Sequence, residues 1–472
     1  MSETTPPGPY SPEAYLVPRE ILARYDVPGP RYTSYPTAPE WSDELSPENA
    51  VDILRENSLS RARVPLSLYV HIPFCHNLCF FCGCNMWVTQ KQDLVTRYLN
   101  AIETEIARVS AVGSSEREVV QIHWGGGTPT YLSSEQIERL FLCLKRHFNI
   151  RPDAEISLEL HPSVTSFDQL ATLRSLGFNR VSMGIQDFDP LVQKTVNRIQ
   201  PFEVTRDLIA ECRRLKFLSV NTDLMYGLPH QTPDGFAATL KKVEQLNPDR
   251  LALFNYAHVP WLKKHQGIFK EDTLPRPDVK LTLFEMAVRH FIEMGYRYIG
   301  MDHFARGDDE LTVHQANGTL RRNFMGYTTH ADSDLYAFGP SAIADLDRAY
   351  LQNERNVHAY IDRIEAGGLP TVRGLRLSDD DRLRRDVINR LFCLLHVNKG
   401  LVETLFDIEF DSVFGSALEK LAPLEQDGLL RLEKRHLRVT PRGQILLRNI
   451  AMVFDAYLAR TPLEGRRFSR TV

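Results

Sequence analysis

The sequence predicts an α/β fold with a parallel sheet of about six βα units, and three observations support it. Short runs of apolar and β-branched residues alternate with amphipathic stretches between residues 67 and 256. The intervals between the runs are long enough for helical crossovers. Polar or glycine residues follow the end of each run, where a partial barrel, a full barrel or a doubly wound sheet places its ligands.

The predicted strands are short, as expected for strands buried on both faces of a parallel sheet. They span residues 67–73, 119–124, 156–160, 180–185, 219–226 and 250–256, with a further strand at 296–303.

The predicted helices lie between these strands, and several have start signals. Ser133 and Ser134 precede Glu135 and Gln136, and Thr232 precedes a proline at the first helical position. The helices span residues 93–109, 134–148, 167–176, 203–216, 233–246 and 278–294.

Three consecutive segments are expected. Residues 1–60 are rich in Pro and Tyr and form an N-terminal arm, and residues 61–365 form the barrel, with a long loop at 305–335. Residues 366–472 form a mostly helical, winged-helix-like domain, with β-like pieces at 429–440 and a last helix at 442–459.

Composition narrows the class of protein. Of 472 residues, 43% are hydrophobic and 25% charged, which excludes a mainly disordered or collagen-like chain. No apolar run approaches the about 20 residues of a membrane helix, and the N-terminus lacks a secretory pattern. The net charge of −4 does not favour a nucleic-acid partner. We therefore expect a cytoplasmic protein without a membrane or nucleic-acid partner.

Four of the seven cysteines fall within ten residues, and Cys75, Cys79 and Cys82 have the spacing C-x3-C-x2-C. Three thiolates from a tight loop bind three irons of a four-iron cluster and leave the fourth iron open to a small molecule. Two alternatives are a zinc site that adds Cys84 or His76 and a fully ligated electron carrier that adds Cys84. The remaining cysteines, Cys143, Cys212 and Cys393, lie in helical patterns and are expected to be core thiols.

At these motifs the sequence resembles the radical S-adenosylmethionine (SAM) enzymes and, more narrowly, the oxygen-independent coproporphyrinogen III oxidase family. The resemblance rests on the arm motif Gly29–Thr37, on Tyr69–Asn85 with its Cys-Gly-Cys-Asn ending, and on His123–Thr130. Further matching segments are 179–188, 223–229, 254–258, 300–305, 322–324 and 468–470.

The resemblance implies a partial (β/α)6 radical SAM barrel that carries a 4Fe–4S cluster and two SAM molecules. It implies oxidative decarboxylation of two propionates of coproporphyrinogen III to vinyl groups, giving protoporphyrinogen IX for porphyrin and haem biosynthesis. In this family a 5′-deoxyadenosyl radical from SAM removes a hydrogen atom from the β-carbon of a propionate, and loss of carbon dioxide and of one electron to an acceptor leaves the vinyl group. Implied partners are the tetrapyrrole substrate and an external electron donor such as a flavodoxin or ferredoxin, and the family expectation is a monomer. A haem-chaperone-like relative without oxidase activity is the closest alternative.

The resemblance also implies the site residues. Cys75, Cys79 and Cys82 hold the cluster, and Tyr69 lies beside the cluster-bound SAM. The other implied SAM contacts are Phe81, Gly126, Gly127, Thr128, Glu159, Gln186, Arg198, Asp223, Ala257 and Ile343.

Arg31 and Met325 also lie in or directly beside motifs that carry the resemblance. Arg31 in the arm suits carboxylate recognition, and a surface salt bridge is its alternative. Met325 stands where the family usually has Gln, which removes a hydrogen-bonding group and puts the binding of the second SAM in question.

Overall fold

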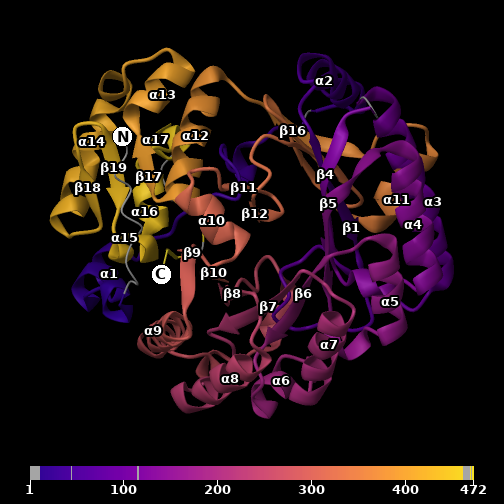
Figure 1. Ribbon diagram of the computed structural model, residues 1–472, viewed down its shortest axis with the longest axis horizontal. Coiled ribbons are helices and arrows are strands. Elements are labelled where there is room, and N and C mark those ends of the chain that lie inside the picture. The colour runs from indigo at the N-terminus through magenta and orange to yellow at the C-terminus, as the bar shows by residue number, and fades with distance from the viewer. Residues whose placement is uncertain (1–10, 44, 114–115, 461–467, 469, 472) are drawn as a thin grey trace. The chain divides into compact units, whose positions relative to one another are not determined.

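The computed structural model describes residues 11–43, 45–113, 116–460, 468 and 470–471 (Figure 1). Two compact units divide the chain: one holds residues 42–280 and 332–376, and the other holds 1–41, 281–331 and 377–472. These units differ from the three consecutive segments 1–60, 61–365 and 366–472, because residues 281–331 pack with the two ends of the chain. Residues 1–10 of the arm and Ser469 of the matching segment 468–470 lie outside the described residues.

The first unit contains the parallel sheet. Strands β1, β4, β5, β6, β7 and β8 pair in this order, each parallel to the next. Their bounds are Leu66–Ile72, Glu118–Gly126, Asn149–Leu160, Arg180–Gln186, Ser219–Tyr226 and Arg250–Asn255. All six strands predicted from 67–256 are therefore present, and the α/β barrel class is confirmed.

Four further strands extend the other edge of this sheet, beyond β1. Strand β13 (Asp334–Phe338) pairs with β1 in parallel, and β14 (Ile343–Asp345), β15 (Ala349–Asn353) and β16 (Thr371–Arg376) follow as an antiparallel series. Asp334 at the start of β13 forms an ion pair with the buried Arg117, whose Nη2 lies 2.5 Å from Asp334 Oδ2.

The helices of this unit are amphipathic and cover the sheet (Figure 1). Ser133 is the N-cap residue of α4 and forms a reciprocal pair of hydrogen bonds with Gln136. At the start of α8, the Thr232 side chain accepts a hydrogen bond from Gly235 N–H. Both helix starts agree with the sequence signals. The helices are α2 (Pro47–Ser60), α3 (Gln92–Val112), α4 (Ser134–His147), α5 (Phe167–Leu176), α6 (Pro190–Thr195), α7 (Phe202–Arg214), α8 (Pro233–Leu246) and α11 (Val357–Glu365).

The second unit corrects two sequence expectations. The single strand expected at 296–303 is a hairpin of β9 (Tyr296–Gly300) and β10 (His303–Arg306), because Gly300 and Met301 have positive φ and turn the chain. The loop expected at 305–335 instead contains α10 (Glu310–Ala316), β11 (Arg321–Asn323) and β12 (Gly326–Thr328).

The C-terminal part of this unit is mostly helical with a small antiparallel sheet, in agreement with a winged-helix-like domain. Strands β17 (His396–Asn398), β19 (His436–Val439) and β18 (Leu430–Leu432) pair in that order. Its core includes Phe392, Phe414 and Phe454. The helices are α12 (Asp379–Leu394), α13 (Lys399–Phe406) and α14 (Phe410–Gln426). The expected last helix is divided into α15 (Pro441–Ile445), α16 (Leu447–Met452) and α17 (Ala456–Arg460). The break between α15 and α16 falls at Leu446, where the backbone leaves the helical conformation.

All seven cysteines are free, and Cys143, Cys212 and Cys393 are buried core thiols, as predicted. None of the helices in the described ranges has both the length and the apolar character needed to span a membrane.

Candidate active site

The predicted site residues on the sheet gather at one edge because the strands run parallel. In the register of the sheet, Tyr69 of β1 lies opposite His123 of β4, and Gly184 of β6 lies opposite Asp223 of β7. Glu159 stands near the end of β5. The carboxyl ends of β1 to β8 therefore present these side chains at a single rim, as the sequence pattern indicates.

The cysteine loop begins at this rim, directly after β1. Cys75 ends the short strand β2 (Phe74–Cys75), which pairs with β3 (Trp87–Val88). Cys75, Cys79 and Cys82 are half-buried and free. Burial raises the pKa of the Cys75 thiol to about 11, whereas a hydrogen bond from the Cys84 thiol lowers the pKa of Cys82 to about 7.

Within the described part of the chain, no three His, Cys, Asp or Glu side chains are gathered closely enough to hold a single metal ion. A mononuclear zinc site needs its ligands about 2.0–2.3 Å from one common point. A four-iron cluster has a different requirement, because each cysteine binds its own iron at a separate corner.

Three carbonyl groups of the cysteine loop accept hydrogen bonds from one neighbouring segment. Lys263 Nζ donates to Cys84 O at 3.0 Å, and His265 Nε2 donates to Cys82 O at 2.9 Å. Gln266 Nε2 donates to Phe81 O at 3.1 Å. We call the three residues Lys263, His265 and Gln266 the clamp. Sequence reasoning missed it, because the spacing of these residues carries no signal.

A second set of bonds fixes the other side of the loop. Asn197 Nδ2 donates to Leu78 O at 2.8 Å, and Phe80 N–H donates to Val196 O at 3.0 Å. Arg198 Nη1 lies 3.7 Å from the Cys79 sulfur, which makes it the cation that faces this thiol. The loop is therefore positioned by residues 196–198, which follow α6.

The glycine run after β4 allows two backbone segments to approach closely. A Cβ on Gly127 would lie 2.8 Å from the backbone of Pro73 and Phe74, and Gly126 has φ +114° with the His71 ring beside it. Gly127 N–H donates to Ile72 O at 2.8 Å. The Thr128 hydroxyl lies 3.5 Å from the Cys75 sulfur, so the glycine run and the cysteine loop form one structure.

A chain of polar contacts connects β1, β4 and β5. His71 Nε2 donates to Asn85 O at 2.8 Å, so its Nδ1 accepts from the Tyr69 hydroxyl at 3.0 Å. The ring of Tyr69 stacks on that of His123, whose Nε2 lies 3.6 Å from Glu159 Oε1. His71 and His123 are further site residues. Both lie inside the motifs that carry the family resemblance, but the sequence analysis did not predict them to be part of the site.

The charge of Glu159 is stabilised by its neighbours. Its side chain is 47% exposed, and it accepts from Gly126 N–H at 3.2 Å. Burial alone raises the pKa of Glu159, but hydrogen bonds from His123 and Gly126 outweigh burial and hold that pKa below its ordinary value. The carboxylate is therefore ionised near neutral pH.

Asp223, Gln186 and Arg198 lie together at the ends of β6 and β7. Burial, together with the charge of Glu159, raises the pKa of Asp223 to about 7. Arg198 Nη2 donates to Gly184 O at 2.6 Å, and a Cβ on Gly184 would lie 2.7 Å from the Gln186 side chain. The small residue at position 184 thus makes room for both polar side chains.

The remaining predicted residues are distributed over both units. Ala257 is exposed in the loop after β8, and Ile343 is half-buried in β14. In the second unit, Arg31 Nη2 lies 3.4 Å from Asp302 Oδ2, and Met325 occupies the turn between β11 and β12. Arg31 therefore has the salt bridge that was its alternative interpretation.

Buried polar atoms test whether this rim suits a polar ligand. Among the described residues, Gln186 Oε1, Arg198 Nε and Asn255 Oδ1 are buried without a hydrogen-bond partner. Buried polar groups are normally satisfied, so these atoms indicate a ligand with several polar groups. SAM, with its ammonium, carboxylate, ribose and adenine groups, fits this requirement, and the three free thiols fit an iron–sulfur cluster.

Comparison with known proteins agrees with this chemistry. Residues 69–243 match the radical SAM superfamily, and residues 377–446 match the HemN C-terminal domain. The chain is 45% identical over 452 residues to the oxygen-independent coproporphyrinogen III oxidase of Escherichia coli strain K12, covering 96% of this chain and 98% of that protein. It is 44% identical over 455 residues to the Pseudomonas aeruginosa protein of the same name, covering 96% and 98% of the two chains. The solved structure of E. coli coproporphyrinogen III oxidase (HemN), described as a radical SAM enzyme, matches with a TM-score of 0.90 and 44% identity, covering 94% of this chain and 100% of that one.

The fold and the site define a radical SAM protein, the class in which a 4Fe–4S cluster works with SAM. The identity over nearly the full length of both chains narrows the class further. The chain belongs to the oxygen-independent coproporphyrinogen III oxidase family.

Proposed function

We propose that this protein catalyses the oxygen-independent oxidative decarboxylation of two propionate groups of coproporphyrinogen III, giving the vinyl groups of protoporphyrinogen IX in haem biosynthesis. The observation that carries the proposal is the 45% identity to a named oxidase across 96% of the chain. The match of residues 69–243, which contain the cysteine loop, to the radical SAM superfamily supports it. The buried unsatisfied atoms at the rim support a ligand with the polar groups of SAM.

In this proposal Cys75, Cys79 and Cys82 hold the cluster, and the glycine run approaches SAM with its backbone. When bound, the reduced cluster and SAM supply the 5′-deoxyadenosyl radical that removes a hydrogen atom from the propionate β-carbon. The protein residues position the reactants and exclude competing hydrogen donors. No side chain has to act as a general acid or base.

Two SAM molecules are part of the proposal. Tyr69, Glu159, Ala257 and Ile343 lie around the first molecule or between the two. The second molecule is contacted by Phe81, Gly126, Gly127, Thr128, Gln186, Arg198 and Asp223. The ionised Glu159 suits the ammonium or ribose hydroxyl groups of such a ligand. Equilibrium dialysis of the reconstituted protein measures this stoichiometry, and saturation at one SAM per chain would reject it.

The proposed partners follow from the reaction. The substrate carries four carboxylates, and Arg31 is the proposed contact for one of them. An external one-electron donor of the flavodoxin or ferredoxin type serves the cluster. We propose a monomer in the cytoplasm.

Product analysis after anaerobic reconstitution tests the function. The protein is supplied with iron, sulfide, SAM, dithionite and coproporphyrinogen III, and protoporphyrinogen IX is expected, detected after oxidation to the porphyrin. Cys82→Ser should give no product, whereas Cys143→Ser, a substitution of a buried core thiol, should retain the activity.

Two outcomes would contradict the proposal in different ways. Cleavage of SAM without vinyl product would indicate a haem-chaperone-like relative. An electron paramagnetic resonance signal of the reduced cluster that does not respond to SAM would indicate a fully ligated electron carrier.

A further inference from the structure

The segment of residues 259–270, after β8, exposes three large apolar side chains within eight positions. Trp261 is 51% exposed, Leu262 68% and Ile268 59%. Single exposed apolar residues are common on protein surfaces, but a group of them indicates an interaction site. We call residues 259–270 the docking segment.

The charge of this region has one sign. From residue 254 to residue 270 the sequence contains three lysines, Lys263, Lys264 and Lys270, and no Asp or Glu. Lys264 and Lys270 are exposed, and the nearest acidic residues along the chain are Glu271 and Asp272. The exposed apolar side chains therefore have lysines as their charged neighbours within the segment, and the exposed Glu271 and Asp272 follow directly after it. Lysines beside an apolar surface complement a partner with acidic groups.

The docking segment is fixed to the cysteine loop rather than freely mobile. Its clamp residues hold the carbonyl groups of Phe81, Cys82 and Cys84. On the buried side, Phe269 packs with Phe80 and Tyr256 in one hydrophobic cluster. A partner bound to this surface would thus lie against the segment that contacts the predicted cluster ligands directly.

We propose that the docking segment is the binding surface for a small acidic redox protein, and this inference rests on the proposed function. Large apolar side chains give a protein partner a surface to bury, and lysines steer an acidic partner and set its orientation. Contact with the loop that carries Cys82 brings the donor next to the group it serves. The proposal concerns non-covalent binding, so no bond forms or breaks at this surface.

The double variant Leu262→Ala/Lys264→Glu tests the proposal, because neither side chain belongs to the clamp. The matched control is Leu142→Ala/Lys145→Glu on the outer face of α4, which makes the same two changes at exposed positions. The affinity of the reconstituted holoprotein for a flavodoxin, and separately for a ferredoxin, is measured by calorimetry at low and high salt. We expect about tenfold weaker binding of at least one donor by the docking variant, and wild-type affinity for the control. The wild-type affinity should fall with added salt.

Decarboxylation driven by dithionite separates this proposal from the proposed function. The docking variant should retain wild-type kcat and KM with this small reductant. A raised KM for coproporphyrinogen III would assign the surface to the substrate, whose apolar ring and four carboxylates have similar chemistry, and would overturn the proposal. Equal affinities of variant and control, or no binding of either donor by the wild-type protein, would overturn it as well. Absence of product with dithionite in the wild-type protein would reject the proposed function, and the binding measurements would stand independently.

Discussion

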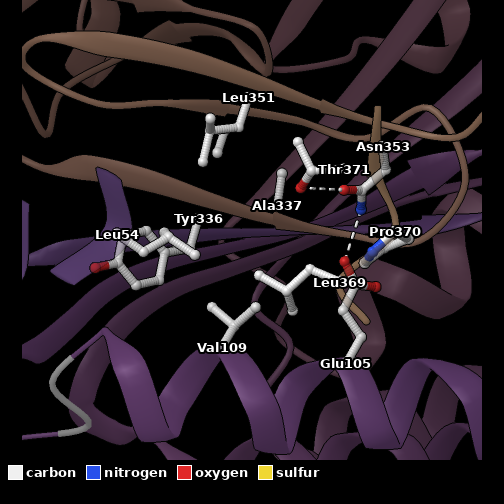
Figure 2. A pocket seen from close by; sticks show the side chains of 11 residues that line it. Leu54, Glu105, Val109, Tyr336, Ala337, Leu351, Asn353, Leu369, Pro370 and Thr371 are labelled. Atoms are coloured by element: carbon white, nitrogen blue, oxygen red, sulfur yellow. Dashed lines mark hydrogen bonds between the residues drawn. The ribbon is translucent and has the colours of Figure 1, made fainter. Parts of the chain in front are cut away.

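Glu105 provides a pH-dependent test of how this fold is held together. Its carboxylate is buried in α3, beside a small cavity lined by Val109, Tyr336 and Asn353 among others (Figure 2). It accepts hydrogen bonds from Asn353 Nδ2 at 2.6 Å, from Gly339 N–H at 2.9 Å and from the Tyr360 hydroxyl. These bonds connect α3 with β15, α11 and the turn after β13.

Two effects oppose each other at this carboxyl group. Burial disfavours its charged form, whereas three donors favour that form. Burial is the larger effect, and it raises the pKa of Glu105 from 4.5 to about 7. At about 1.4 kcal/mol for each pKa unit, the difference amounts to about 3 kcal/mol in the free energy of unfolding.

Proton binding decides whether the free energy of unfolding rises or falls with pH. Between pH 4.5 and 7 the folded protein retains a proton that the unfolded chain releases, so the contribution of Glu105 is fully present below pH 4.5. It is lost as the pH rises through 7. The neutral variant Glu105→Gln has no such dependence. The stability of the wild-type protein relative to this variant should therefore fall by about 3 kcal/mol between pH 4.5 and pH 8.

Urea denaturation measures this difference, with tryptophan fluorescence as the signal, to which the buried Trp124 in the same unit contributes. A constant offset between the two proteins is expected at every pH, because an amide cannot accept all three hydrogen bonds. Only the change of that offset with pH carries information. If the offset is the same at pH 4.5 and pH 8, Glu105 stays ionised and the three donors outweigh burial, which would refute the reasoning.

Three further substitutions test the loop and the core. Replacement of any one of the three predicted cluster cysteines by serine should abolish iron binding after reconstitution, whereas the control Cys143→Ser should retain it. An intact cluster in all three variants would reject the ligand assignment. His265→Ala should accelerate loss of the cluster absorbance under chelator about tenfold, and a wild-type rate would show that the clamp has no such role. Gly127→Ala should lower the free energy of unfolding by about 1–3 kcal/mol, because its Cβ would meet backbone atoms at 2.8 Å, while the control Gly267→Ala, with 3.9 Å to its nearest neighbour, should have a small effect. Equal losses in the two glycine variants would contradict this account.

The sequence predicted the parallel strands well because burial on both faces leaves a simple pattern. Residues 219–226 read as a short apolar run and form β7 with the same bounds. The glycine and cysteine motifs follow such strands, so their position at one rim was also predictable. Strand order in a parallel barrel follows chain order, which is why local patterns gave a correct architecture there.

The antiparallel part was missed for the opposite reason. Strand β11 reads Arg-Arg-Asn and β14 reads Ile-Ala-Asp, and neither is long enough to show alternation. Such strands form because a neighbour supplies hydrogen bonds, as β15 does for β14. Their existence is decided by tertiary pairing, so neither β11 within the expected loop 305–335 nor β14 after it was predicted.

The same distinction applies to the active site. The cysteine spacing is local, so it predicted a cluster loop, but the clamp is not local: His265 meets Cys82 only because β8 ends beside β1's loop in space. The electrostatic character of the rim is likewise a property of the assembled sheet. Asp223 has a pKa raised to about 7 partly by the charge of Glu159, two strands away in the sheet. Two carboxyl groups that disfavour each other's charge are stabilised together by a cationic ligand, and SAM carries both an ammonium and a sulfonium group. The apposition of these two acids is thus a stronger argument for the ligand's charge than either residue taken alone in the sequence.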